Sequence, residues 1–304
     1  MVTEIEVDRK SYLGSHDIAA VMGDHPFMKR MDVFMNKTGE SKFVQTEQQE
    51  WGLLNEQAIL FKYGEKTELH TTYFNHFQRH KDHEWMGGHS DAVFFKERRG
   101  VDAKNIRFKG HEWGEAGTDQ VPRYVLWQAH HFMTLYDFDV WDICVLFSGC
   151  QHEIYTVQRD QSISDSILEI GQEFWENHIV KGIAPEIDDS EACRLYLRKK
   201  YPSHDDELRV ATVSECLLMA ELRDAEAVKK INEATVIGLK NHLQDMIGGS
   251  KGLVSPFGNV TWKHQAGARR IDTKKLKAEH PEIAKQCTKQ GDGGRVFRKS
   301  FKEE

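Results

Sequence analysis

The chain has little cysteine or proline and no long apolar run. Five of its 304 residues are cysteine and six are proline. Because the cysteine number is odd and the cysteines lack paired spacing, we expect no disulfide framework and a reducing cytoplasm. No apolar run approaches the length of a membrane span, and the polar, acidic first ten residues are unlike a signal peptide. These absences predict a cytoplasmic protein with no membrane contact.

The chain also lacks an excess of positive charge. It carries 41 Lys and Arg against 48 Asp and Glu, a formal net charge of −7. The charge is uneven, because residues 251–302 hold 13 basic against 4 acidic side chains, whereas residues 1–250 hold 28 against 42. This asymmetry predicts that the C-terminal segment meets an acidic partner. A basic face that is merely solvated is the alternative.

Apolar residues are present in sufficient number for one large domain with an appended module, since they make up 39% of the chain. Their spacing predicts helices and strands in alternation over the first 180 residues. This order predicts an α/β fold, a mixed sheet flanked by helices. The predicted helices span 11–40, 47–63, 121–135 and 164–178, and the predicted strands span 68–77, 92–95, 101–108, 139–148 and 152–158.

The remainder of the chain is predicted to be helical with a small β element. Residues 181–190 are a linker, and residues 191–250 are one long helix or a helix pair that ends at Gly248-Gly249. The apolar stripe of this helix indicates core packing, or else a coiled contact with another subunit. Residues 251–304 form a basic module with a hairpin that turns at Phe257-Gly258 and a final strand at 295–297. The predicted boundaries are therefore 1–190, 191–250 and 251–304.

A set of polar residues occurs in order within the first of these segments: Glu56, Asp91, Asp102, Lys104 and Gln128. The triplet Asp102-Ala103-Lys104 sits on a predicted strand. Side chains at i and i+2 of a strand point to one face, so Asp102 and Lys104 are predicted to face one site. Three carboxylates and a lysine in this order are typical of a divalent-metal site that cuts phosphodiester bonds.

The chemistry of such a site assigns a role to each residue type. Mg²⁺ prefers carboxylate, carbonyl and water oxygens, neutralises a phosphate and lowers the pKa of a bound water. We expect Asp91 and Asp102 to anchor the ion, with Glu56 completing the shell or holding a second ion. The Ala103 carbonyl is a further candidate ligand. Lys104 would hold the attacking water and offset negative charge at phosphorus.

Each residue taken alone has a simpler explanation. Gln128 cannot titrate, so it is either a satisfied buried amide or a hydrogen-bonding partner of the water, of Lys104 or of the phosphate. Asp91 can cap a turn, Glu56 can be a surface charge on a helix, and an Asp-x-Lys strand face is usually solvated. The joint order of the set favours the metal site over these separate explanations.

The residues around this set resemble a known family, the YqaJ-type viral recombinases in the lambda-exonuclease-like branch of the PD-(D/E)xK nucleases. The similarity covers roughly residues 9–190. The matching stretches are residues 13–23, Asp32-Val33-Phe34 through Lys37-Thr38-Gly39, Trp51-Gly52-Leu53-Leu54-Asn55-Glu56, Gly88-His89-Ser90-Asp91-Ala92, Val101-Asp102-Ala103-Lys104, Val121-Pro122-Arg123-Tyr124 running into Gln128-Ala129-His130-His131-Phe132-Met133, and Glu173-Phe174-Trp175.

This resemblance implies that residues 1–190 are a nuclease core that degrades one strand of a double-stranded DNA end, 5′ to 3′, for phage-type recombination. It implies Mg²⁺ as the metal, with Mn²⁺ able to substitute. It also implies a single-strand annealing protein as partner, a ring-shaped homo-oligomer, and a phage or prophage protein in a bacterial host. Some related nucleases hold an iron–sulfur cluster, but here the cysteines are not spaced to bind one.

The resemblance further implies a pocket for the 5′-phosphate of DNA. Arg9 stands where relatives carry a phosphate-reading arginine, and His16 occupies the serine position of the family's Gly-Gly-Ser-Asp motif, with Ser15 before it. We therefore expect Arg9, together with Ser15 or His16, to bind the phosphate. Asp102 stands where the family more often has glutamate, and the shorter acid shifts the metal.

Two other functions share these features. A structure-selective or sequence-selective endonuclease would use the same core, and cleavage of covalently closed circular DNA would reveal it. A non-catalytic DNA-binding scaffold of recombination would keep the fold and cut nothing. Such a scaffold would usually lose Asp91, Asp102 or Lys104, and all three are present here.

Overall fold

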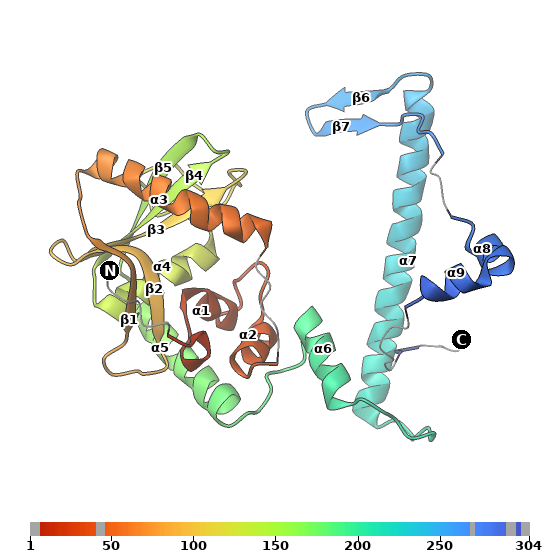
Figure 1. The fold of residues 1–304 in the computed structure, drawn as a ribbon, viewed down its shortest axis with the longest axis horizontal. Helices are drawn as coiled ribbons and strands as arrows, with labels where there is room; N and C mark the ends of the chain where they lie inside the picture. The colour runs from red at the N-terminus through yellow and green to blue at the C-terminus, as the bar shows by residue number, and fades with distance from the viewer. Residues whose placement is uncertain (1–6, 41–45, 268–270, 290–295, 299–304) are drawn as a thin grey trace. The chain divides into compact units, whose positions relative to one another are not determined.

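A computed structural model describes residues 7–40, 46–267, 271–289 and 296–298. Its internal contacts divide the chain into two compact units, Met1–Lys200 and Tyr201–Glu304. The first unit holds a sheet with helices around it, and the second holds a long helix and a small hairpin (Figure 1).

The first unit is built on a five-stranded mixed sheet in the order β1-β2-β3-β4-β5. Neighbouring strands are antiparallel except β3 and β4, which run parallel. A parallel pair needs a crossover connection, which here contains helix α4 (Arg123–Tyr136). The strands are β1 (Tyr73–Arg79), β2 (Gly87–Phe94), β3 (Arg99–Ile106), β4 (Val140–Phe147) and β5 (Gln151–Gln158).

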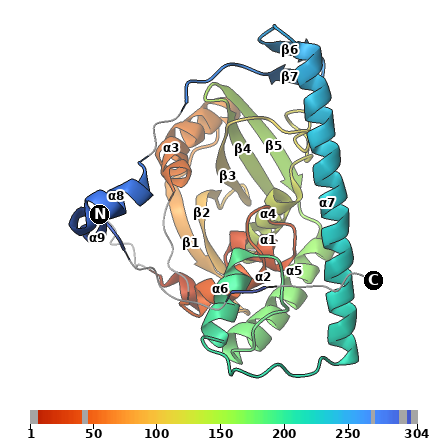
Figure 2. The same cartoon turned by 90° about the vertical axis from the view of Figure 1, so that its right-hand side faces the viewer.

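Helices cover both faces of this sheet (Figures 1 and 2). On one face α3 (Glu47–Thr67) buries Ile59 and Tyr63 in a cluster with Cys144 of β4. The next strand residue, Val145, belongs to the larger core on the other face, beneath α1 and α4. The remaining helical elements of the unit are α1 (Ser15–Val21), α2 (Arg30–Lys37), α5 (Gln161–Phe174) and α6 (Glu191–Lys200), with the short elements η1 (Arg9–Ser11) and η2 (Trp175–Val180).

The segment before α1 is tied to the start of β2 by backbone hydrogen bonds. Leu13 N–H donates to the Trp85 carbonyl at 2.6 Å, and Gly87 N–H donates to the Leu13 carbonyl at 3.2 Å. The Leu13 side chain is fully buried. Since α1 also packs against α4, these bonds place the first turn of α1 beside the strand that carries Asp91.

This architecture confirms the predicted α/β fold with a mixed sheet flanked by helices. Several bounds differ from the prediction, and the helix predicted over 11–40 is two helices, α1 and α2, joined by residues 22–29. β1 begins at Tyr73 rather than Glu68, because α3 continues to Thr67 and Glu68 ends it in the left-handed conformation, with a φ of 59°. β2 begins at Gly87 rather than Ala92, since residues from Gly87 onward already pair with β1.

The second unit begins with irregular chain and continues into α7 (Val213–Ile247), which is 35 residues long. Thr212 and Glu215 cap its start, and Gly248, with a φ of 52°, follows its end. The predicted hairpin is present, and the predicted final strand is wrong, because Val296 and Phe297 are irregular; residue 295 lies outside the described residues. The elements after α7 are β6 (Gly252–Ser255), β7 (Gly258–Thr261), α8 (Thr273–Glu279) and α9 (Pro281–Gln286).

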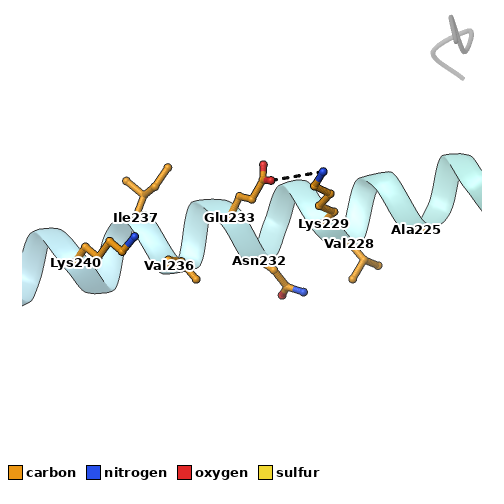
Figure 3. Close-up of a pocket in the computed structure, with 8 residues that line it drawn as sticks. All are labelled: Ala225, Val228, Lys229, Asn232, Glu233, Val236, Ile237 and Lys240. Atoms are coloured by element: carbon orange, nitrogen blue, oxygen red, sulfur yellow. Dashed lines mark ion pairs between the residues drawn. The ribbon is translucent and has the colours of Figure 1, made fainter. Parts of the chain in front are cut away.

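Most of α7 is exposed. Within this helix, which the structure describes throughout, Ile247 is the one buried residue. Figure 3 shows the side chains that line a hollow along the middle of the helix, with apolar Val236 and Ile237 beside the ion pair Lys229–Glu233 at 3.9 Å. The apolar stripe therefore does not form a core inside the second unit. Neither α7 nor any other helix in the described ranges is apolar enough over a sufficient length to cross a membrane.

Gly100 of β3 lies directly against the ring of Trp141 in β4, and this contact generates a stability prediction. A Cβ added at Gly100 would overlap the Trp141 ring, which is fully buried, so the ring or the backbone would have to shift. We predict that Gly100→Ala lowers the free energy of unfolding by about 1–3 kcal/mol, the usual cost of overpacking a core. Urea denaturation measures the change. Gly110→Ala is the control, because a Cβ at that exposed position meets nothing within 4 Å; equal loss in both variants would contradict the account.

Candidate active site

The β2–β3 ladder ends where the predicted acidic residues begin. The last paired residues toward this end are Ala92 and Val101. Beyond them the Asp91 side chain takes the place of a backbone carbonyl, since its Oδ2 accepts the Ala103 N–H at 2.7 Å. Asp91 is thereby bound to the backbone of the Asp-x-Lys triplet, and its charge interacts with that of Asp102.

Asp102 and Lys104 lie on the same face of β3, as their spacing predicts. Asp102 is buried, and its Oδ2 is 3.3 Å from Lys104 Nζ. Lys104 also donates to Oε1 of Gln128, a fully buried residue of α4, at 2.9 Å. Burial would lower the pKa of Lys104, but the carboxylates of Asp102 and Asp91 outweigh burial and raise that pKa above its usual value. Lys104 therefore remains charged.

The predicted carboxylates lie close enough for their charges to repel. Burial, and then the charge of Asp102, raises the pKa of Asp91 well above its usual value, although Lys104 and the Ala103 N–H act in the opposite direction. Glu56 reaches the same region from α3, and burial followed by Asp102 raises its pKa as well. Crowded carboxylates of this kind are stabilised by a cation.

These donors fit a hard divalent ion. Carboxylate and carbonyl oxygens are the protein ligands that Mg²⁺ prefers, and the raised pKa values of Asp91 and Glu56 mean that their ionised form is disfavoured until a cation stabilises it. In the residues that the structure describes, no group of three or more His, Cys, Asp and Glu side chains is already gathered as a metal site. The charges of the acids interact, but their oxygen atoms do not surround one point. Ion binding would therefore require the side chains to move closer together.

Gln128 connects this cluster to α1. Its Nε2 lies 3.0 Å from Nδ1 of His16. His16 is exposed to solvent, yet surrounding protein atoms, and then the charge of Lys104, lower its pKa to about 3. The ring is therefore neutral at physiological pH. A continuous set of hydrogen bonds joins Asp102, Lys104, Gln128 and His16.

Arg9 and Ser15 occupy different environments near His16. Arg9 is exposed, and its charge acts on the His16 ring. Lys37 Nζ donates to the Arg9 carbonyl at 2.7 Å and pairs with Asp17 at 2.6 Å, which holds the Arg9 backbone beside α1. Ser15 is only 8% exposed. Of the two residues predicted as alternatives, His16 faces solvent and Ser15 does not.

Two residues near the site were assigned no role from the sequence, although Tyr124 belongs to the stretch Val121-Pro122-Arg123-Tyr124 that carries the family resemblance. The Tyr124 side chain interacts with the charge of Lys104, and the ring of His25 lies 6.0 Å from the rings of both Tyr124 and His16, between centroids. The position of Tyr124, four residues before Gln128 on one helix face, could have suggested a role for it. His25 sits in the loop between α1 and α2, where no periodic pattern marks it.

Comparison with known proteins gives a family match and several distant relatives. Residues 6–139 match the model of the YqaJ-like viral recombinase domain, which includes the whole polar set from Glu56 to Gln128. The chain is 20% identical to the uncharacterized protein YqaJ of Bacillus subtilis (strain 168) over 292 residues, 93% of this chain and 90% of that protein. These two matches confirm the family resemblance that the motifs predicted.

Similar solved structures include two exonucleases. The alkaline exonuclease LHK-Exo from Laribacter hongkongensis is 12% identical with a TM-score of 0.46, over 63% of this chain and 94% of that chain. A phage related exonuclease from Haemophilus somnus 129PT is 15% identical with a TM-score of 0.42, over 57% of this chain and 96% of that chain.

The raised pKa of Asp91 generates a prediction about stability without metal. An acid whose pKa is higher in the folded than in the unfolded protein destabilises the fold once the pH exceeds its unfolded value, and this cost disappears as the pH falls below that value. Asn cannot ionise but can still accept the Ala103 N–H. We predict that Asp91→Asn raises the melting temperature in EDTA at pH 7.5 by roughly 2–4 °C, the effect of about 1 kcal/mol in a domain of this size.

Thermal melts of both proteins between pH 4 and 8 check this prediction. The gain should shrink toward pH 4, near the unfolded pKa of aspartate. Added Mg²⁺ should stabilise the wild-type protein more than the variant. A variant that melts below the wild-type protein in EDTA at pH 7.5 would show that Lys104 already compensates the Asp91 charge.

Proposed function

We propose that this chain, whose residues 6–139 form a YqaJ-like viral recombinase domain, is a Mg²⁺-dependent deoxyribonuclease that digests double-stranded DNA from its ends, 5′ to 3′. The observation that carries the proposal is the Asp102–Lys104 pair on β3, at 3.3 Å, whose charges interact with those of Asp91 on β2 and Glu56 on α3. A phosphodiester is an anion and would be repelled by these acids alone. The cluster therefore suits a substrate that arrives with a cation.

The residues of the cluster have separate tasks in this proposal. Asp91, Asp102 and Glu56, with the Ala103 carbonyl, are the groups that would hold Mg²⁺ or Mn²⁺. When bound, the ion would supply charge neutralisation at the phosphate and a lowered pKa of water. Lys104 contributes a second, permanent positive charge, because its pKa is raised, and it would offset negative charge at phosphorus.

Gln128 would act by holding Lys104 in place. Its carbonyl accepts one hydrogen of the Lys104 ammonium while Asp102 lies on another side. Two such partners restrict the long lysine side chain, so that its remaining N–H can point to a water or a phosphate oxygen. An amide suits this task because it does not change charge with pH.

Digestion from one end would leave single strands, the substrates of a single-strand annealing protein, which is the partner we propose. The recombinase-domain match supports this context, in the cytoplasm of a bacterial host that carries the phage or prophage. A ring-shaped homo-oligomer around DNA is part of the same proposal. His16, which contacts Gln128, and Arg9, whose charge acts on His16, are the proposed contacts to the 5′-phosphate, with Ser15 as the alternative to His16.

The first catalytic prediction concerns the Asp-x-Lys triplet. We predict that Asp102→Ala and Lys104→Ala each lower the rate of cleavage of linear duplex DNA at least about a hundredfold, because each removes charge stabilisation of the transition state. DNA binding should remain, because contacts to the phosphate backbone outside this site would still hold the duplex. Gel assays of cleavage and binding measure the two effects. Asp119→Ala, at an exposed loop acid, is the matched control.

The same assay separates the exonuclease from the endonuclease. Linear duplexes with 5′-phosphate, 5′-hydroxyl or blocked ends, and a covalently closed circle, are incubated with Mg²⁺, Ca²⁺ or EDTA. The proposal expects digestion of linear DNA that depends on Mg²⁺ and on a free end. Cutting of the closed circle would identify an endonuclease, and wild-type cleavage by Asp102→Ala would remove the site assignment.

The second prediction concerns the basic segment after α7. Neutralisation of DNA phosphates by lysine and arginine releases counterions, so binding through this segment must weaken with salt. We predict that deletion of residues 251–304, which contain 13 Lys and Arg up to residue 302, weakens duplex binding and flattens its salt dependence. The measurement is a salt titration of binding in Ca²⁺, paired with light scattering. An unchanged slope with altered oligomer mass would assign the segment to protein contact instead.

A further inference from the structure

A row of residues along α7 repeats with the spacing of a coiled coil. From Leu218 to Met246 the row alternates steps of four and three residues, which keeps its members on one side of the helix. Seven of the nine members are apolar, and the two polar ones are neighbours in the middle of the row. The members are Leu218, Leu222, Ala225, Lys229, Asn232, Val236, Leu239, Leu243 and Met246. We call this row the seam, because two helices with such a repeat pack along it.

The seam has no partner among the residues that the structure describes. None of its members is buried, and Leu218 and Met246 at its two ends are 67% and 72% exposed. Figure 3 shows its middle part, from Ala225 to Val236, along an open hollow. A helix in a protein is stabilised mainly by the packing of its apolar face. The 35-residue α7 therefore needs a partner along this side.

The partner must be another helix of matching length. The seam is about 43 Å long, at a rise of about 1.5 Å per residue. Among the helices in the described ranges, α3 is the next longest with 21 residues, and its Ile59 and Tyr63 are buried against the sheet. A second copy of α7 has the length, the spacing and the apolar residues that the seam requires.

The polar residues of the seam favour an antiparallel pair. In a parallel pair with both helices in register, Lys229 would face Lys229 of the second copy, and like charges repel. In the antiparallel pair Lys229 faces Asn232 of the second copy, whose side-chain carbonyl can accept from the ammonium. The same register places apolar residues opposite one another along the rest of the seam: Ala225 with Val236, Leu222 with Leu239, and Leu218 with Leu243.

Charged residues beside the seam fit this register better than the parallel one. The antiparallel pair brings Glu221 opposite His242 of the second copy, whose ring can donate a hydrogen bond, whereas the parallel pair brings Glu221 opposite Glu226. The antiparallel pair has one contact of like charges, between Glu226 and the second copy's Glu233. Lys229 lies on the same side of the seam, with Nζ 3.9 Å from Oε1 of Glu233 in its own chain, and its charge compensates this contact.

We propose that α7 pairs with α7 of a second copy of this chain as an antiparallel coiled coil, with Lys229 against the second copy's Asn232 near its centre. Polar residues at such positions fix the register of a coiled coil at a cost in stability. Both copies use the same surface, so the contact closes at two chains. A ring is built from head-to-tail contacts between two different surfaces. The α7 contact is therefore separate from the proposed ring, and it does not depend on DNA cleavage.

Cross-linking of the full chain tests the register. The exposed Cys150, Cys216 and Cys287 are first replaced by serine. A chain with both Ala225→Cys and Val236→Cys should then form a covalent dimer with a short bifunctional maleimide. Chains with only one of these changes should not, because two copies of one position lie about 16 Å apart along the axis of the antiparallel pair. Cross-linking of either single variant with itself would show a parallel pair, and no dimer from the double variant would exclude the contact; both results overturn the proposal.

The mass of the assembly tests the seam itself. Light scattering of the wild-type protein should give an even number of chains per particle, whether or not a ring also forms, and a monomer or an odd number overturns the proposal. Leu239→Glu should weaken the association of two copies at least about tenfold, because each pair would hold two carboxylates in apolar surroundings. Ile237→Glu is the matched control, the same kind of change at a residue that is 59% exposed on another side of the helix. Equal weakening by both variants would show that the seam is not the contact.

Discussion

The charge of Lys104 is the constraint on which the candidate site depends. A lysine held among buried groups would lose its proton unless carboxylates compensated the cost of burial. Asp102 and Asp91 do so, and they raise the pKa of Lys104. Burial, and then the charge of Asp102, raises the pKa values of Asp91 and Glu56, so the ionised form of both acids is disfavoured without a further cation. A bound cation would favour the ionised form of both acids.

The fold supplies these groups from elements that are far apart in the chain. The end of the β2–β3 ladder frees the Asp91 carboxylate to accept from the Ala103 N–H. The parallel β3–β4 pair requires the crossover that contains α4, and α4 carries Gln128. Backbone bonds of Leu13 hold α1 beside β2, so that His16 meets Gln128. The positions of Asp91, Gln128 and His16 therefore depend on hydrogen bonds and connections of the sheet.

Local patterns predicted the sheet, its flanking helices and the shared face of Asp102 and Lys104, because strand periodicity is a property of neighbouring residues. They could not predict that Asp91 lies inside a strand, since the residues before Ala92 gave no clear alternation although they pair with β1. The bond between Gln128 and His16 joins residues 112 positions apart and depends on how α1 packs on α4. The family resemblance pointed to Arg9, Ser15 and His16 as phosphate-binding candidates. The structure then distinguishes two of them, because Ser15 is buried and His16 is exposed.

The position of a bound ion tests the central claim most directly. Mn²⁺ can replace Mg²⁺ at oxygen ligands and is located in a crystal by its anomalous scattering. The account predicts one anomalous peak, or two, in contact with carboxylate oxygens of both Asp91 and Asp102, with Glu56 turned toward it and Lys104 still bound to Gln128. An ion at another place in the chain, with Asp91 and Asp102 free of metal at saturating Mn²⁺, would contradict it.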